Sequence, residues 1–388
     1  MNLTVKCKLN PSYGQRNALL KGMSAFNRAA NFASLAAFRF KIYDKISLHN
    51  KIYHHLRNEF ELPSQMAVRV IGKVVDTYAD KHKRKSSHEF SEYGAIDYDN
   101  KNLSINTKDK TISVSTPSGR LKSIPYSCGK DLSQYELCSQ SKLIYDKQKK
   151  TLHVAFCVKT DCAETYSPIE YIGVDLGIKN IAVTSENQFF SGENIEKNRK
   201  KFTNRRKSLQ AKGTKSAKRK LVKIGKKQSN FVKNTNHCTS KLLVATAKTL
   251  GKGLALEDLS RPNLSKSKNP AVKFNKPLKE SLGNWAFWQL RQFIEYKAKI
   301  AGVPVILVNP AYTSQRCSVC KHTCESNRVS QSEFVCQKCG LKLNADLNAA
   351  INIAALGNIN CPNVDATLGK IVRSFSVANC KPPALAAG

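Results

Sequence analysis

Three acidic residues occupy positions from which they can bind a metal ion together. Asp175 lies inside the apolar run "YIGVDLGI", Glu257 ends the run "GLALE", and Asp346 stands at the head of the helical segment "ADLNAAINIA". An unpaired buried carboxylate is costly, and the two apolar runs contain no Lys or Arg to pair with one. Carboxylate oxygens suit Mg²⁺ or Mn²⁺, and two such ions about 3.5–4 Å apart can activate water and stabilise the leaving oxygen of a phosphodiester. The sequence therefore predicts a metal-dependent hydrolytic site.

Simpler interpretations of two of these positions stay open. Asp175 can be a turn or cap residue, and Asp258 rather than Glu257 can be the ligand from its strand. Adjacent residues of a strand face opposite sides of a sheet, so only one of Glu257 and Asp258 can point at a shared site. We favour Glu257 as the ligand and expect Asp258 to cap the following loop.

Five cysteines are crowded into residues 317–339, and four of them form two Cys-x2-Cys knuckles with fifteen residues between them. This is the spacing of a zinc ribbon, in which four thiolates surround a tetrahedral ion. His322 and Cys324 are further potential donors, but the paired knuckles favour the other four cysteines. A closed four-thiolate shell is structural, so we expect the zinc to do no chemistry. The predicted zinc ligands are Cys317, Cys320, Cys336 and Cys339.

The charge of the chain indicates a polyanionic partner. Its 388 residues include 64 Lys+Arg against 28 Asp+Glu, a formal net charge of +36 that is densest between residues 197 and 233. Each basic side chain placed on a phosphate releases condensed counterions, and solubility alone seldom requires so large a charge of one sign. Nucleic acid is the favoured partner, and lysine-rich helices that are merely solvated are the simpler alternative.

The sequence disfavours a membrane or secreted protein. The start "MNLTVKCKLN" has no signal-peptide apolar core, and no run approaches roughly 18 apolar residues. The 13 cysteines indicate a reducing compartment with metal binding rather than a disulfide framework. We expect a protein of the prokaryotic cytoplasm that acts on the nucleoid.

Apolar periodicity divides the chain into two halves. Residues 1–10 alternate and predict a strand, residues 15–85 have helical spacing, and residues 88–161 return to a period of two, so a helical module interrupts a β module. From residue 171 the pattern predicts three strands, a long basic helical stretch to about residue 250, a strand, a helix, a strand and a last helix. The order βββαβαβα is that of the ribonuclease H-like fold, a mixed sheet with helices on its faces. The cysteine ribbon is then an insertion that fixes the loop before Asp346.

Five motifs carry a resemblance to a known family. The segments "IGVDLGIKNIAVTS", "LALEDLS", "TSQRCSVC", "FVCQKCG" and "ADLNAAINIA" resemble, in this order, the RuvC motifs and zinc ribbon of the TnpB family. These are transposon-encoded RNA-guided nucleases, the compact relatives of type V CRISPR effectors. The similarity covers about residues 170–356 and extends more loosely to "PSYGQRNALLKGMSAFNRAANFAS". One departure is "NAD" around Asp346, where many relatives have Asp-Arg-Asp, which leaves the metal ligand in place.

The resemblance implies an α/β fold: a ribonuclease H-like RuvC domain with an inserted four-cysteine zinc ribbon, and an N-terminal wedge-like β module interrupted by a helical recognition module. The implied boundaries are 1–10 and 88–168 for the wedge-like module, 11–87 for the recognition module, 169–310 and 343–356 for the RuvC domain, 311–342 for the ribbon, and 357–388 for a poorly ordered tail.

The resemblance also implies an activity: RNA-guided cleavage of double-stranded DNA beside a short flanking motif. Asp175, Glu257 and Asp346 match the family's catalytic carboxylates, which hold Mg²⁺ or Mn²⁺ in one RuvC site, and Zn²⁺ is the second metal. The expected partners are a guide RNA, transposon-end-derived or CRISPR-type, and the target DNA, with a monomeric protein favoured. An RNA-guided repressor without cleavage and a guide-free, structure-selective nuclease are the alternatives.

Two groups of residues are candidates for nucleic-acid contact. Gln65 and Arg69 lie in a segment that resembles the family helix approaching the flanking motif, although an ordinary amphipathic helix explains them equally well. The basic stretch of residues 197–233 should follow a phosphate backbone, because Lys and Arg contact phosphates without reading sequence. Its candidate residues are Lys200, Lys201, Arg205, Arg206, Lys218, Arg219 and Lys220.

Overall fold

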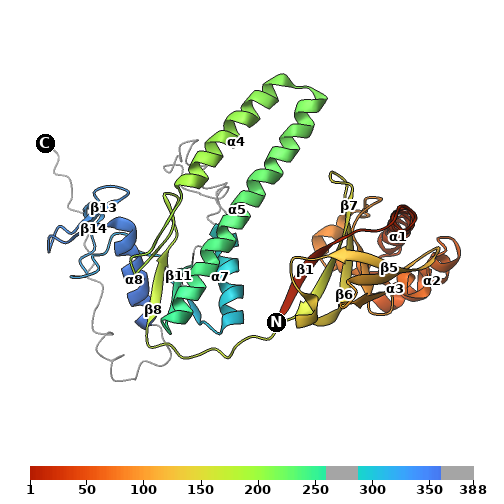
Figure 1. Ribbon diagram of the computed structural model, residues 1–388, viewed down its shortest axis with the longest axis horizontal. Coiled ribbons are helices and arrows are strands. Elements are labelled where there is room, and N and C mark those ends of the chain that lie inside the picture. The colour runs from red at the N-terminus through yellow and green to blue at the C-terminus, as the bar shows by residue number, and fades with distance from the viewer. Residues whose placement is uncertain (259–286, 360–388) are drawn as a thin grey trace. The chain divides into compact units, whose positions relative to one another are not determined.

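The computed structural model describes residues 1–258 and 287–359, which belong to two compact units (Figure 1). The first unit is Met1–Asp161, and the second begins at Cys162. Each unit has its own apolar core. None of the helices in the described ranges is long and apolar enough to cross a membrane.

A seven-stranded sheet in the order β2-β6-β7-β1-β5-β4-β3 lies in the first unit. β1 pairs antiparallel with β7 and β5, so the start of the chain lies inside the sheet. Cys7 of β1 and Cys128 form a disulfide, which our expectation of a reduced chain did not include. The strands are β1 (Asn2–Leu9), β2 (Ile96–Asp99), β3 (Leu103–Asn106), β4 (Thr111–Thr116), β5 (Gly119–Ser127), β6 (Glu136–Asp146) and β7 (Thr151–Lys159).

Three helices lie between β1 and β2 in the chain: α1 (Tyr13–Phe40), α2 (Lys45–Asn58) and α3 (Ser64–Tyr78). A capping box starts α1, because the side chain of Ser12 accepts from the backbone N–H of Gln15 and the Gln15 side chain accepts from that of Ser12. The apolar stripes of these helices and one face of the sheet form a single core. The helical segment and the β segment therefore fold as one body.

The second unit contains a five-stranded sheet in the order β10-β9-β8-β11-β12. Its first three strands form the predicted antiparallel meander, and β8, β11 and β12 run parallel. The strands are β8 (Tyr171–Asp175), β9 (Asn180–Thr184), β10 (Phe189–Ser191), β11 (Gly253–Glu257) and β12 (Val305–Val308). This mixed sheet has the strand order and directions of a ribonuclease H-like fold.

Helices cover both faces of this sheet. On one face, Ile172 and Leu254 share a core with α5 (Lys215–Thr249) and α7 (Phe287–Ala301). On the other face, the alternate residues Tyr171 and Ala255 pack with Ile353 of α8 (Ala345–Ile359). The alternation of β8 and β11 therefore separates a face toward α5 and α7 from a face toward α8.

The helix α8 lies directly on the backbone of β8 at Gly173. A Cβ atom built at Gly173 would lie 2.0 Å from the carbonyl oxygen of Ala350 and 2.4 Å from the backbone nitrogen of Ala354. No side chain fits there, so glycine allows the close approach of helix and strand. The helix continues to Ile359, three residues beyond the predicted end of the domain, and residues 360–388 of the expected tail lie outside the described residues.

The basic stretch expected from about residue 194 to 250 is a hairpin of two helices, α4 (Glu193–Lys212) and α5, which extends well beyond the sheet (Figure 1). Gly213 ends α4 with φ +62°, a left-handed conformation that favours glycine. Thr214 caps α5 by accepting a hydrogen bond from the N–H of Ala217 at 3.1 Å. The break between the helices is therefore encoded in two adjacent residues.

Between β12 and α8 lies a small two-stranded ribbon of β13 (Glu333–Val335) and β14 (Lys342–Asn344). Phe334 is fully buried in it, beside Cys317, Cys336 and Ala345. Because Ala345 is the first residue of α8, the ribbon packs against the start of that helix.

Candidate active site and metal centre

Asp175, Glu257 and Asp346 come together at one edge of the second sheet. Asp175 and Glu257 are the last residues of β8 and β11, which are adjacent and parallel, so their carboxyl ends meet. Asp175 lies two residues after Gly173, and Glu257 lies two residues after Ala255, so both face the same side of the sheet as these two residues. That side is covered by α8, whose second residue is Asp346. All three carboxylates line the same polar cleft.

Burial keeps two of these carboxyl groups, those of Asp175 and Glu257, from ionising easily. Burial raises the pKa of Asp175 to about 7, and the charges of Glu257 and Asp346 push it the same way. The pKa of Glu257 is also raised by burial, although the Thr313 hydroxyl opposes the shift. A cation bound in the cleft would stabilise the ionised forms, because it supplies the opposite charge that the buried acids lack. The donor set therefore fits a hard divalent cation.

Three other side chains contact the carboxylates, and none of them was predicted from the sequence. The Thr313 hydroxyl donates to Glu257 at 2.5 Å, and the Asn180 amide donates to Asp346 at 2.9 Å. The guanidinium of Arg328, in the ribbon, lies 3.7 Å from Asp346. Asn180 and Thr313 do lie in the quoted motifs "IGVDLGIKNIAVTS" and "TSQRCSVC", which was the available signal. Nothing in the local sequence distinguishes Arg328 from other arginines.

Asp258 faces away from this cleft. Its carboxylate pairs with Arg291 of α7 at 2.7 Å, and Arg291 also pairs with Glu295 at 2.8 Å. Asp258 is therefore engaged on the α7 face of the sheet, as the alternation of strand residues requires. The loop that we expected Asp258 to cap lies outside the described residues.

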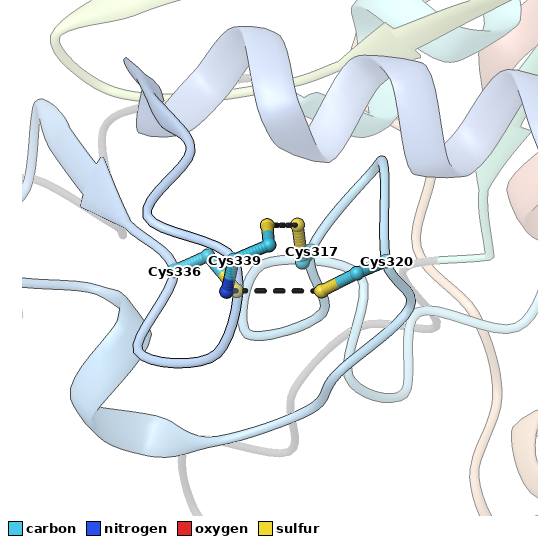
Figure 2. A group of neighbouring side chains, drawn as sticks. All are labelled: Cys317, Cys320, Cys336 and Cys339. Carbon is cyan, nitrogen blue, oxygen red and sulfur yellow. Dashed lines mark hydrogen bonds between the residues drawn. The ribbon is translucent and has the colours of Figure 1, made fainter.

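Four cysteine side chains converge between the two knuckles (Figure 2). The sulfur of Cys317 lies 3.7 Å from that of Cys339, the sulfur of Cys320 lies 3.5 Å from that of Cys336, and all four atoms lie within 4.8 Å of one another. Thiolates bound to tetrahedral zinc at about 2.3 Å would lie about 3.8 Å apart, so the cluster fits Zn²⁺. In the described ranges this is the one closed group of Cys, His, Asp or Glu ligand atoms.

The surroundings of Cys336 favour its thiolate form. Burial pushes the pKa of Cys336 upward, but hydrogen bonds from the backbone N–H groups of Cys339 and Lys338 outweigh it and bring this pKa to about 6. Cys324 is turned elsewhere, with its sulfur 2.9 Å from the Ser326 hydroxyl. The structure thus groups the four predicted cysteines and leaves Cys324 out.

The candidate nucleic-acid contacts fall in different units. In the first unit, the Gln65 amide donates to Asp99 of β2, and the Nε of Arg69 is buried without a hydrogen-bond partner. In the second unit, the candidates line the α4–α5 hairpin. The exposed ones are Lys200, Lys201, Arg205, Lys218, Arg219 and Lys220, and Arg206 is half-buried. Among them, the Nζ of Lys200 lies 3.9 Å from the Oε1 of Glu196.

Two protein-family models match parts of the chain. The family model described as "Cas12f1-like, TNB domain" matches residues 287–353, and the model described as "Probable transposase" matches residues 155–268. The first covers the ribbon together with Asp346, and the second covers Asp175 and Glu257.

Curated relatives agree with these models. The CRISPR-associated endodeoxyribonuclease Cas12f1 of Sulfoacidibacillus thermotolerans is 31% identical over 254 residues, 61% of this chain and 56% of that protein. The putative RNA-guided DNA endonuclease InsQ of Escherichia coli (strain K12) is 34% identical over 200 residues, 48% and 49% of the two chains. The TnpB-like protein MJ0751 of Methanocaldococcus jannaschii is 30% identical over 177 residues, which are 45% of this chain and 60% of that protein. The chain spans about half the length of the curated relatives it matches.

Solved structures share the fold. A chain in a Cas12f1–sgRNA–target DNA complex superposes with a TM-score of 0.60 at 16% identity, covering 87% of this chain and 82% of that chain. The mini-RNA-guided endonuclease CRISPR-Cas_phi3 gives a TM-score of 0.51 at 9% identity, covering 92% of each chain. The sheet, its helices and its edge of carboxylates thus define an RuvC-type α/β protein. The two family models and the TnpB-like relatives make the chain similar to proteins of the TnpB family.

Proposed function

We propose that this protein is an RNA-guided DNA endonuclease of the TnpB type, which cleaves double-stranded DNA beside a short flanking motif in a single RuvC site. The observation that carries the proposal is the meeting of Asp175, Glu257 and Asp346 in one cleft of an RuvC-type sheet. A repressor that only binds DNA would have no use for three carboxylates clustered in one cleft, because burial and the neighbouring charges at Asp175 cost stability without a cation.

The side chains around the cleft have distinct roles in the proposed reaction. Asp175, Glu257 and Asp346 would hold Mg²⁺ or Mn²⁺, which activates a water and stabilises the leaving oxygen of the phosphodiester. Thr313 and Asn180 donate to Glu257 and Asp346 and so orient the carboxylate planes. Arg328 lines the same cleft and supplies positive charge where the scissile phosphate would lie.

The proposed partners are a guide RNA and a double-stranded target DNA. The net charge of +36 and the exposed lysines and arginines of the α4–α5 hairpin support a long polyanionic partner, because such contacts gain free energy from counterion release. The names of the relatives support RNA guidance, since they include an RNA-guided DNA endonuclease and CRISPR-associated endodeoxyribonucleases. We propose a monomer that acts in the cytoplasm.

We propose that the first unit combines the wedge-like and recognition modules and contacts the motif that flanks the target. Gln65 and Arg69 are its candidate contacts, and both residues are partly exposed. In the free protein Asp99 holds the amide of Gln65, so DNA would have to compete with that carboxylate.

A guide exchange tests the proposal. Purified protein is combined with an RNA whose guide segment matches one DNA, and then only that segment is changed while the flanking motif is kept. We expect cleavage to move to the newly matched DNA in the presence of Mg²⁺. Binding without any cleavage would replace the proposal with the repressor, and cleavage that ignores the guide or survives RNase treatment would replace it with the guide-free nuclease.

A further inference from the structure

Two asparagines of α8, Asn348 and Asn352, are buried one turn apart, with 0% and 4% of their surface exposed. Asn348 donates to the carbonyl oxygen of Arg316 at 2.8 Å and accepts from the N–H of Ser318 at 2.9 Å. Asn352 donates to the carbonyl oxygens of Thr313 and Arg316 at 3.0 and 2.6 Å. We call Asn348 and Asn352 the asparagine pair; it binds three backbone positions of one short segment.

The segment that the asparagine pair holds reaches both metal centres. At its start, the hydroxyl of Thr313 donates to Glu257 in the carboxylate cleft. Near its end lies Cys317, the first of the four clustered cysteines. Four hydrogen bonds between α8 and this segment therefore fix a stretch of chain in which Thr313, the partner of Glu257, lies only four residues before Cys317 of the zinc ribbon.

The same helix carries Asp346 at its start, so α8 binds both sides of the proposed active site. Asn348 follows Asp346 by two residues, and Asn352 lies one helical turn further. A rigid helix with short hydrogen bonds to residues 313–318 sets where Thr313 lies relative to Asp346. Since Thr313 orients Glu257, the spacing between the carboxylates of β11 and α8 depends on these contacts.

We propose that Asn348 and Asn352 are positioning residues, which hold Thr313 so that the order imposed by the zinc ribbon reaches Glu257. The inference rests on the proposed metal-dependent cleavage. Under this inference the ribbon has two effects. It fixes the loop before Asp346, and it also holds Glu257 of β11 in place through the backbone of residues 313–318. Deleting the pair should therefore weaken divalent-cation binding in the cleft while zinc stays bound to its four cysteines.

The test compares Asn352→Leu with Thr313→Val and with the double variant, all in the full-length zinc-containing protein. Mn²⁺ binding to the RNA-free protein is measured by calorimetry, and zinc content is measured by metal analysis. Removing a partner of a metal ligand typically costs about 10–100-fold in metal affinity, so we expect about a tenfold weaker Mn²⁺ affinity in each single variant. Because both changes act on Glu257 through one contact, the double variant should be no weaker than the singles. One zinc per chain should remain in all three.

Asn358→Leu is the matched control, because Asn358 is a third asparagine of α8 that accepts from the N–H of Tyr171 and does not touch the ribbon. Its Mn²⁺ affinity should equal that of the wild type even if its thermal stability falls. Unchanged Mn²⁺ affinity in Asn352→Leu, or additive losses in the double variant, would overturn the inference. If the wild type binds Mn²⁺ but cleaves no DNA, the proposed function fails while this comparison still decides the positioning role.

Discussion

Asp175→Asn should stabilise the protein when no Mg²⁺ is present. Burial and the two neighbouring carboxylates raise the pKa of Asp175 from its ordinary value of 3.8 to about 7. A raised pKa means that the folded state loses stability as pH rises from 3.8 to about 7, and the full loss is present above pH 7. At 1.36 kcal/mol for each pH unit, the loss is about 4 kcal/mol at pH 8 and about 2 kcal/mol at pH 5.5. Asparagine carries no charge at this position, so the variant avoids this loss of stability.

The assay is urea unfolding of the RNA-free, zinc-containing protein in buffer without other divalent cations. Both tryptophans of the chain, at positions 285 and 288, come after Cys162 in the sequence, and Trp288 lies in α7 of the second unit, so tryptophan fluorescence reports the unit that contains Asp175. We expect the free energy of unfolding of Asp175→Asn to exceed that of the wild type by up to about 4 kcal/mol at pH 8 and by about half as much at pH 5.5. Asp258→Asn is the control, because its carboxylate is half-exposed and paired with Arg291.

Mg²⁺ should remove more than half of the stability difference at pH 8. A cation at a hundred times its dissociation constant stabilises the folded wild type by about 2.7 kcal/mol, whereas a variant that has lost a ligand gains less. The reasoning fails if Asp175→Asn is no more stable than the wild type at pH 8 without Mg²⁺. It also fails if the difference does not shrink toward pH 5.5, because a packing effect would not depend on pH.

Three further predictions concern cleavage, zinc and nucleic-acid binding. Asp346→Ala should reduce cleavage by more than about 100-fold, which exceeds the loss expected for a residue that only contacts a metal ligand, and should keep target binding. Asp258→Ala should have a much smaller effect on cleavage. Substantial cutting by Asp346→Ala in Mg²⁺ would contradict the assignment. Cys336→Ser should lose the bound zinc and lower both thermal stability and cleavage, while Cys324→Ser keeps one zinc per chain by metal analysis; a wild type without zinc would refute the ribbon. Changing Lys200, Lys201 and Arg205 to Gln should lower the slope of log affinity against log salt by about 2–3, and an unchanged slope would remove the hairpin from the nucleic-acid interface.

The sequence by itself determined the chemical inventory of this protein. Cysteine spacing identifies a four-thiolate site, because a knuckle is a local structure that four adjacent residues specify. Apolar runs predicted the strands of a mixed sheet, and strand alternation required that only one of Glu257 and Asp258 face the shared site. The net charge follows from composition alone. These features depend on residues that are close in sequence, which is why they could be read from it.

Only the tertiary structure decided how these parts meet. Asn180 contacts Asp346 across 166 positions of sequence, and Arg328 reaches the cleft from a loop of the ribbon. The asparagine pair lies in a segment that predicts a helix, but its backbone partners lie thirty or more residues earlier. Such contacts depend on how α8 packs on Gly173 and on where the ribbon folds back. Local propensity does not specify that packing, because it is set by the shapes of surfaces that the fold brings together.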